Sequence, residues 1–407
     1  MRWLLRWQAA ILPFIFASCG WSGTVGGELG ATIIEGELFW VARLQPELTV
    51  GRFGLGLDAE LLVGRDGVRD DDWTSSHKWV RLIRYVRWGM PDDPLHARLG
   101  ALDDVTLGHG LVVRHYTNWY DEDFRRLGMQ TRGHTPRVGG EAFASSIGRW
   151  EVLGARLWVD PFNRCRPSLR HVRFGLTAVV DCDPDAERGT DDQMTILAAD
   201  VEFPVIHAPP ARLFLYGDAA RILRYGSGAV IGAGVNTGGF AGISGFGARL
   251  ERRFLGARFI PEYIDAFYGV DRYDEGADRG KESALAGKHS SDGWYGEVSG
   301  MVLQTIEIVG GFSRLQGRPG SGVLHVGIRS GPIRQRWELS GSLDKGAIER
   351  LGDLSRRDRT LVELCVGYRI SAWSLLYVRF RRTFERQDDG YRLVDVFVPR
   401  ASLSVAF

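Results

Sequence analysis

The last seventeen residues of the chain constrain its fold most, because they alternate between two chemically different sides. Counting back from Phe407 in steps of two gives an apolar side formed by Val405, Leu403, Ala401, Pro399 and Phe397. A period of two indicates a β-strand whose two sides face different environments. The first polar residue on the apolar side is Asp395, twelve residues before the end. At a tilt near 45°, that length crosses roughly 28 Å, close to the apolar band of a membrane-spanning barrel.

This ending resembles the C-terminal signature of bacterial outer-membrane β-barrel proteins, which close on an aromatic residue that their assembly machinery reads. The matching residues are Leu403, Val405 and Phe407. The resemblance implies a location in the outer membrane of a diderm bacterium, with outer-membrane lipids and the barrel-assembly machinery as partners. Pro399 departs from the pattern, because a central strand has no place for a residue without an N–H group.

The other end of the chain predicts a signal peptide over residues 1–20. Arg2 and Arg6 precede the apolar run 9–16, which is too short to span a bilayer, and small residues follow at 17–20. The stretch 16–19 also resembles a lipobox, in which Cys19 would be acylated. The sequence leaves open whether Cys19 is lipidated or removed with the signal peptide.

Residues 21–407 are predicted to form a single domain, a closed antiparallel transmembrane β-barrel. Alternating segments recur along this whole region, many of them ten or more residues long, whereas strands of soluble proteins usually have five or six. Only Gly51 and Arg52 separate two of them, which predicts a tight hairpin. Short and long connections alternate, except for one irregularity between residues 205 and 270. We therefore expect about 18 strands, between 16 and 20.

No 40-residue repeat supports a propeller, and no short periodic rungs support a β-solenoid. After the signal peptide, no stretch reaches the 18 apolar residues that a transmembrane helix needs. If the chain spans a membrane, a closed barrel is the remaining way to satisfy its backbone hydrogen bonds.

Charged residues of both signs alternate with the apolar side of the predicted strands. So many inward charges predict a water-filled lumen, although single members of the set suit cross-strand ion pairs in the wall. The predicted lumen-facing charges are Arg43, Glu47, Asp58, Glu60, Arg84, Arg156, Arg173, Asp200, Glu202, Arg249, Glu251, Arg258, Glu262, Arg329, Glu363, Arg369 and Arg400.

Residues 100–133 are the part that fits the strand pattern least, and they are expected to form either a lumen-inserted segment or an extracellular loop. The run from Gly100 to Gly110 resembles a motif of uncharacterised barrel proteins from spirochaetes, a resemblance that implies no residue roles. Inside the lumen, its clustered charges would narrow the pore and select solutes by charge. The predicted constriction residues are His109, Arg114, His115, Tyr116, Tyr120, Asp121, Glu122, Asp123, Arg125 and Arg126.

Enzyme and metal chemistry find little support in the sequence. His109 lies near Asp103 and Asp104, but no serine elbow or paired motif accompanies it. His109 and His115 lack a third metal ligand at a suitable spacing, and the cysteines show no C-x-x-C pair. A net charge of +1 argues against a nucleic-acid partner. We therefore expect no catalysis, no metal and no cofactor.

The sequence favours an outer-membrane channel for diffusion or selective uptake of small hydrophilic solutes. One alternative is a transporter of hydrophobic substrates resembling the fatty-acid channels, although the first strand begins too soon after residue 20 to leave room for their N-terminal hatch. Another alternative is a structural or adhesin-like barrel at the cell surface with a plugged lumen. Solute identity, ion selectivity and oligomeric state stay open.

Overall fold

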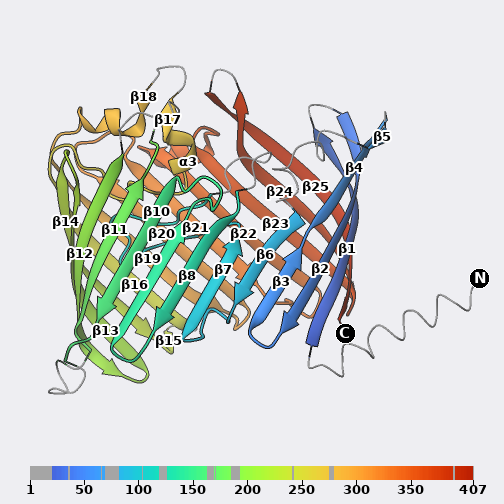
Figure 1. Ribbon diagram of the computed structural model, residues 1–407, viewed down its shortest axis with the longest axis horizontal. Coiled ribbons are helices and arrows are strands. Elements are labelled where there is room, and N and C mark those ends of the chain that lie inside the picture. The colour runs from blue at the N-terminus through green and yellow to red at the C-terminus, as the bar shows by residue number, and fades with distance from the viewer. Residues whose placement is uncertain are drawn as a thin grey trace, which may run out of the picture.

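In the computed structural model, the chain forms one antiparallel β-sheet that closes on itself into a barrel (Figure 1). The barrel strands pair in chain order, and the last strand, β25, pairs with the first, β1, from Thr24↔Ala406 to Gly30↔Arg400. The predicted fold class is confirmed. The structure describes residues 21–34, 37–65, 67–68, 82–102, 104–118, 126–162, 169, 171–184, 193–240, 243–274, 279–387 and 390–406.

The strands of the first half are β1 (Trp21–Ile34), β2 (Glu37–Val50), β3 (Phe53–Leu57), β4 (Ala59–Gly64), β5 (Gly67–Val68), β6 (Ile83–Trp88), β7 (Leu95–Gly100), β8 (Gly128–His134), β9 (Val138–Ala144), β10 (Val152–Val159), β11 (Arg173–Asp181) and β12 (Met194–Ala208). Those of the second half are β13 (Ala211–Ile222), β14 (Ser227–Thr237), β15 (Gly239–Phe240), β16 (Ile243–Leu255), β17 (Tyr273–Asp274), β18 (Arg279–Gly280), β19 (Ser291–Val302), β20 (Ile306–Leu315), β21 (Gly322–Ser330), β22 (Trp337–Ile348), β23 (Thr360–Ser371), β24 (Ser374–Gln387) and β25 (Gly390–Ala406). The helices of the described residues are α3 (Tyr268–Asp271), η3 (Lys281–Leu285) and η4 (Leu351–Ser355). Within the described part of the chain, no helix is long and apolar enough to cross a membrane.

The described residues supply 20 barrel strands, at the upper limit of the predicted range. This number counts β3 and β4 as one interrupted strand, because both pair with β2. β5 and β15 are two-residue pieces beside β4 and β16, and β17 and β18 form a separate small sheet.

The outer surface of the barrel is apolar and the inner surface is polar, the reverse of a water-soluble protein. Leu157 and Leu176 point outward and are 69% and 68% exposed. Their neighbours Arg156 and Thr177 point inward and are buried. A closed barrel with an apolar exterior leaves no backbone group unpaired toward lipid, so these strands span a membrane.

The C-terminal strand shows this arrangement as the alternation predicts. Leu403 and Val405 of β25 are exposed on the outer face, whereas Arg400 points inward and binds Glu28 of β1. Pro399 pairs with β24 just beyond Arg400, the last β25 residue in register with β1. A residue without an N–H group is tolerated there because one neighbouring strand has already diverged.

Connections differ between the two ends of the barrel (Figure 1). Short turns, such as the predicted hairpin at Gly51 and Arg52, lie at the end where β25 finishes. Longer connections lie at the opposite end, including those from β7 to β8 and from β16 to β19. Such asymmetry is typical of outer-membrane barrels.

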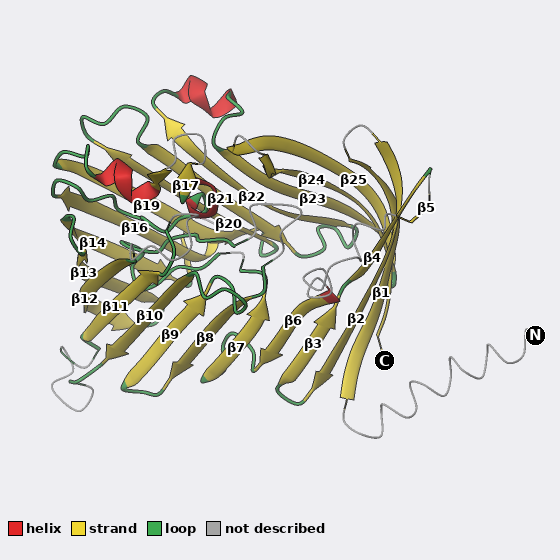
Figure 2. Cartoon of the chain, turned by 45° about the horizontal axis from the view of Figure 1, so that its top comes forward, coloured by secondary structure: helices red, strands yellow, loops and turns green. Residues whose placement is uncertain are grey.

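Two of the long connections turn back into the barrel (Figure 2). Residues 101–118, the inward segment, meet residues 256–271, the inner loop, where Val113 bridges Ile264. Their apolar side chains pack on inward-facing residues of β9 to β16, among them Phe143, Ile196 and Tyr216. This packed region fills one side of the barrel interior with a hydrophobic core.

Candidate functional site

The inward segment leaves the wall at a glycine and is tied at its base by an asparagine. Gly100 ends β7 with φ of +151°, and a Cβ there would lie 2.7 Å from the carbonyl oxygen of Arg84. Asn118 accepts a hydrogen bond from Leu102 N at 2.9 Å and donates one to Ser145 O at 2.8 Å. One side chain thus joins both ends of the segment to the β9–β10 connection.

A tight turn at Gly108 and Gly110 forms the tip of the segment. Gly110 has φ of +87°, and its missing Cβ leaves the space that the Arg114 guanidinium occupies, 2.4 Å from where a Cβ would stand. Only glycine accommodates both the left-handed backbone and this close approach. Gly110 therefore positions Arg114, whereas Gly108 leaves space for Arg156.

Arg114 joins a fully neutralised group of four charges in the packed region. Its guanidinium lies 2.8 Å from Glu251 and 2.9 Å from Glu262, and Arg253 lies 3.0 and 2.7 Å from the same two carboxylates. The Arg114 guanidinium also stacks 3.8 Å above the Tyr295 ring. Although burial opposes the charge, Glu251 and Glu262 hold the pKa of Arg114 well above its usual range. This group anchors the inward segment to β16.

His109 is the second polar anchor of the segment. Its ring stacks on Tyr216 at 4.0 Å, and its Nε2 lies 3.8 Å from Asp200 and 3.9 Å from Glu202 without a hydrogen bond. Burial is the largest influence and lowers the pKa of His109 to about 4. The ring is therefore neutral near pH 7.

The opposite side of the interior holds a charged cavity of about 410 Å³. Ion pairs beside it join neighbouring strands: Arg43 binds Asp58, and Arg400 binds Glu28 at 2.9 Å and Glu60 at 3.0 Å. Five arginines and three carboxylates are among the residues that line it. The lining residues are Glu28, Arg43, Gln45, Asp58, Ile83, Arg84, Arg98, Ala101, Arg126, Leu127, Glu363, Cys365, Leu375, Tyr377, Arg379 and Ser402.

The structure separates the residues that were grouped as a constriction. Arg114 and Tyr116 are buried in the packed region, and His115 faces β21. Arg126 lines the charged cavity and binds Glu151. Tyr120, Asp121, Glu122, Asp123 and Arg125 lie outside the described residues, as does Asp103. The described members therefore do not form a single ring of charge, because the inward segment packs against one wall.

The predicted lumen-facing charges lie on the inner side of the barrel, with one exception. Arg258 is wrong as a lumen charge, because it is exposed in the turn that follows β16, with φ of +58°. Glu262 does face inward, but from the inner loop and not from a strand. The alternation around residue 258 continued in the sequence although the strand had ended at Leu255.

Sequence reasoning missed several inward residues of the charged cavity. Arg379 is one of them, and it shares its side of β24 with Tyr377 and Arg381. The period-two pattern indicates the inward side of β24, because Tyr377, Arg379 and Arg381 alternate with the outward residues Val378 and Phe380. His325 and Asp344 were also missed; alternation along β21 and β22 marks them as inward, but no local signal shows that they lie beside the inward segment.

The predicted signal peptide, the possible lipidation of Cys19 and the role of Phe407 remain predictions. Residues 1–20, with Cys19, and Phe407 lie outside the described residues. Among the described cysteines, Cys182 and Cys365 are free thiols.

No protein-family model and no curated protein matches this sequence, so the resemblance of residues 100–110 to spirochaete barrels gains no support. Solved structures with a similar course of the chain include Pseudomonas aeruginosa OccK2 (OpdF) in complex with glucuronate, with 12% identity, TM-score 0.37 and coverage of 95% of this chain and 97% of that one. Pseudomonas aeruginosa OccK11 (OpdR) has 11% identity, TM-score 0.36 and 95% coverage of both chains. Acinetobacter baumannii OccAB3 has 12% identity, TM-score 0.34 and coverage of 95% and 99%.

These similarities are too distant to place the chain in a family. The membrane assignment follows from the molecule itself: a closed antiparallel barrel of 20 strands with an apolar exterior. Closed barrels of this kind belong to the outer membrane of diderm bacteria, and the chain is an outer-membrane β-barrel protein.

Proposed function

We propose that this protein is a channel for small hydrophilic solutes, which cross the barrel through the charged cavity and not through the packed region. The main observation behind this proposal is that the two sides of the barrel interior differ. The packed region is closed by apolar contacts, whereas the cavity holds about 410 Å³ of space between polar walls. A hydrated solute follows the path on which it keeps polar contacts.

The charge of the lining supports a preference for anions. Five arginines and three carboxylates line the cavity, so the lining itself carries a positive excess, while Arg84 and Arg126 pair with Glu47 and Glu151, which do not line it. Arg379 contributes to it directly: its side chain is 28% exposed and lies 3.8 Å from Glu363. Since field lines concentrate in a narrow low-dielectric passage, a small excess of charge acts strongly on permeating ions.

Single-channel recording of the refolded chain in a planar bilayer tests the proposal. The variant is the double substitution Arg98→Gln and Arg379→Gln, which removes two charges from the cavity lining. The expected result is discrete conductance in the wild type and a shift of the reversal potential toward cation selectivity in the variant. Arg252→Gln is the matched control, because Arg252 points outward on β16 beside Trp294.

Each other outcome favours a different function. Conductance with the same selectivity in wild type and double variant would place the path elsewhere in the barrel. A barrel shown by circular dichroism to be folded, yet without conductance, would reject the channel and favour the plugged, surface-interaction barrel. Absence of ion conductance together with binding of a fluorescent fatty acid would favour the hydrophobic-substrate transporter.

A further inference from the structure

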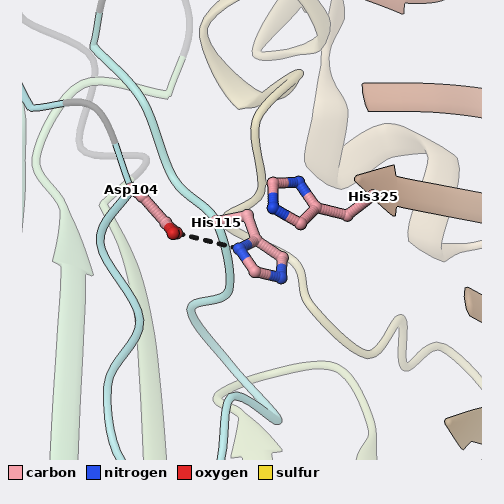
Figure 3. Close-up of side chains that lie close together, drawn as sticks. All are labelled: Asp104, His115 and His325. Atoms are coloured by element: carbon pink, nitrogen blue, oxygen red, sulfur yellow. Dashed lines mark hydrogen bonds and ion pairs between the residues drawn. The ribbon is translucent and has the colours of Figure 1, made fainter. Parts of the chain in front are cut away.

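Two histidines and an aspartate meet where the inward segment faces the barrel wall (Figure 3), and a second aspartate, Asp344, contacts one of the histidines. Asp104 and His115 belong to the inward segment, on either side of the Val105–Tyr116 bridge. His325 comes from β21 and Asp344 from β22, which are neighbouring strands of the wall. Residues more than 200 positions apart in sequence therefore converge at one point.

The two imidazoles are held by carboxylates and face each other. His115 Nδ1 lies 2.8 Å from Asp104 Oδ1, and His325 Nδ1 lies 2.7 Å from Asp344 Oδ1. The two rings stack at 3.6 Å with an angle of 12° between their planes. Ligand atoms of Asp104, His115 and His325 all lie within 4.8 Å of one another.

The cluster contains two carboxylates, whose combined charge matches that of one divalent cation. One divalent cation neutralises both carboxylates and leaves the rings neutral, which is the form that binds metals.

We propose that Asp104, His115 and His325 form a site for a divalent transition-metal cation, for which Zn²⁺ is the probe. Two imidazoles and a carboxylate are a ligand set that suits Zn²⁺. Asp344 orients His325 through Nδ1 and leaves Nε2 for the metal, the usual arrangement of a carboxylate behind a metal-binding histidine. The cation would replace the proton that His115 and Asp104 now share, and it would coordinate one atom of each residue.

The site requires only small side-chain movements. Ligand atoms around tetrahedral Zn²⁺ lie about 3.4 Å apart, so atoms within 4.8 Å close on the ion by shifts of about 1 Å. The Asp104 side chain is 55% exposed. Solvent at that side supplies the fourth ligand and an entry path.

A bound cation would fasten the inward segment to β21, next to the Arg114 anchor. His115 has φ of +52°, a left-handed conformation that is costly for a residue other than glycine, and its N donates to Thr106 Oγ1 at 3.1 Å. The local fold thus holds the ring toward the wall. This inference does not depend on the proposed channel function.

Isothermal titration of the refolded chain in detergent with Zn²⁺ tests the site. The expected result is one saturable site in the wild type, at least tenfold weaker binding in His325→Gln and a 10–100-fold loss in Asp344→Asn. His207→Gln is the matched control, because His207 stacks on His171 at 3.9 Å but belongs to no three-ligand group among the described residues. Asp104→Asn, at an exposed position, repeats the test if His325→Gln does not fold.

A second readout separates a metal site from a purely structural cluster. Zn²⁺ should slow hydrogen–deuterium exchange of residues 101–118 in the wild type and leave it unchanged in His325→Gln. Absence of saturable Zn²⁺ binding in the folded wild type, or equal affinity in wild type and His325→Gln, would overturn the proposal. A loss of affinity in His207→Gln alone would overturn it as well, by placing the binding at the other histidine pair.

Discussion

The packed region and the charged cavity are built from the same kind of strand, yet they contain arginines that differ in burial and in the number of carboxylates they contact. In the packed region, Arg114 and Arg253 are buried and each meets two carboxylates. Beside the cavity, Arg84 is 44% exposed and meets one carboxylate, Glu47, at 2.7 Å. Arg43, which lines the cavity, is nevertheless buried among Glu28, Asp58 and Glu60. Inward-facing arginine is therefore a structural anchor where carboxylates enclose it and a solvated wall charge where it stays exposed.

The energetic consequences differ accordingly. A buried ion pair that loses one partner leaves an uncompensated charge in a low dielectric, whereas an exposed pair is screened by water. Substitutions in the packed region should therefore change stability, and substitutions around the cavity should change permeation.

The largest effect is expected for Arg114→Met. Removal of the guanidinium leaves Glu251 and Glu262 buried with only Arg253, so the free energy of unfolding should fall by about 3–5 kcal/mol. Urea unfolding of the chain in lipid vesicles measures it. Arg84→Met is the control and should change the same quantity by less than about 1 kcal/mol. Equal effects of the two substitutions would abolish the distinction between the regions.

A cavity in the apolar part of the packed region should have the next largest effect. Leu111 is 1% exposed within the hydrophobic core, so Leu111→Ala should lower the free energy of unfolding by about 2–5 kcal/mol. Hydrogen exchange of the inward segment should accelerate in parallel. Leu354→Ala, at an exposed position of η4, serves as the control. An unaltered exchange rate in Leu111→Ala would show that the core does not hold the segment.

Acid should loosen the packed region through His109. The folded-state pKa of about 4 lies below the ordinary value of 6.5, mainly because of burial. Stability from neutral His109 is thus fully present above pH 6.5 and is lost as the pH falls through 4, by about 3 kcal/mol in total. The groups around the ring are Arg156, Asp200, Glu202, Arg249 and Glu251.

Unfolding of wild type and His109→Asn between pH 7 and pH 4 tests this contribution. The difference in stability between the two proteins should shrink as the pH falls. Wild type alone is a poor measure, because burial raises the pKa of the Asp265 carboxyl to about 6. Protonation of Asp265 therefore raises the stability of the folded protein as the pH falls over part of this range, whereas protonation of His109 lowers it. His289→Asn, on an exposed residue, is the control. A difference independent of pH would show that His109 is not held neutral.

The smallest effect on stability is expected beside the cavity. Arg84→Gln breaks an exposed pair with Glu47 and should lower the free energy of unfolding by less than about 1 kcal/mol. The same substitution should shift ion selectivity toward cations, because it removes a positive charge from the lining. A loss of several kcal/mol would instead make Arg84 an anchor of the Arg114 kind.

Much of the wall could be predicted because the alternation of apolar and polar residues within each strand indicates which side faces outward. In β25, outward Leu403 and inward Arg400 follow from period two alone, and the hairpin at Gly51 follows from spacing. Arg258 was misplaced for the same reason, since local alternation does not show where a strand ends. Among the described members of the predicted constriction, His109, Arg114 and Arg126 acquire different partners once the segment packs against one wall, and alternation along the chain does not encode those partners.

The sequence by itself determined that this chain forms a membrane-spanning barrel, which side of each strand meets lipid, and that the interior carries charges of both signs. These properties are local: they depend on side-chain alternation over about ten residues and on the solvent that each face meets. The tertiary structure alone decided that the inward segment covers one wall, that Arg114 meets Glu251 and Glu262, and that His115 meets His325. These contacts join residues as many as 210 positions apart, and no local pattern encodes them because they exist only once the barrel has closed.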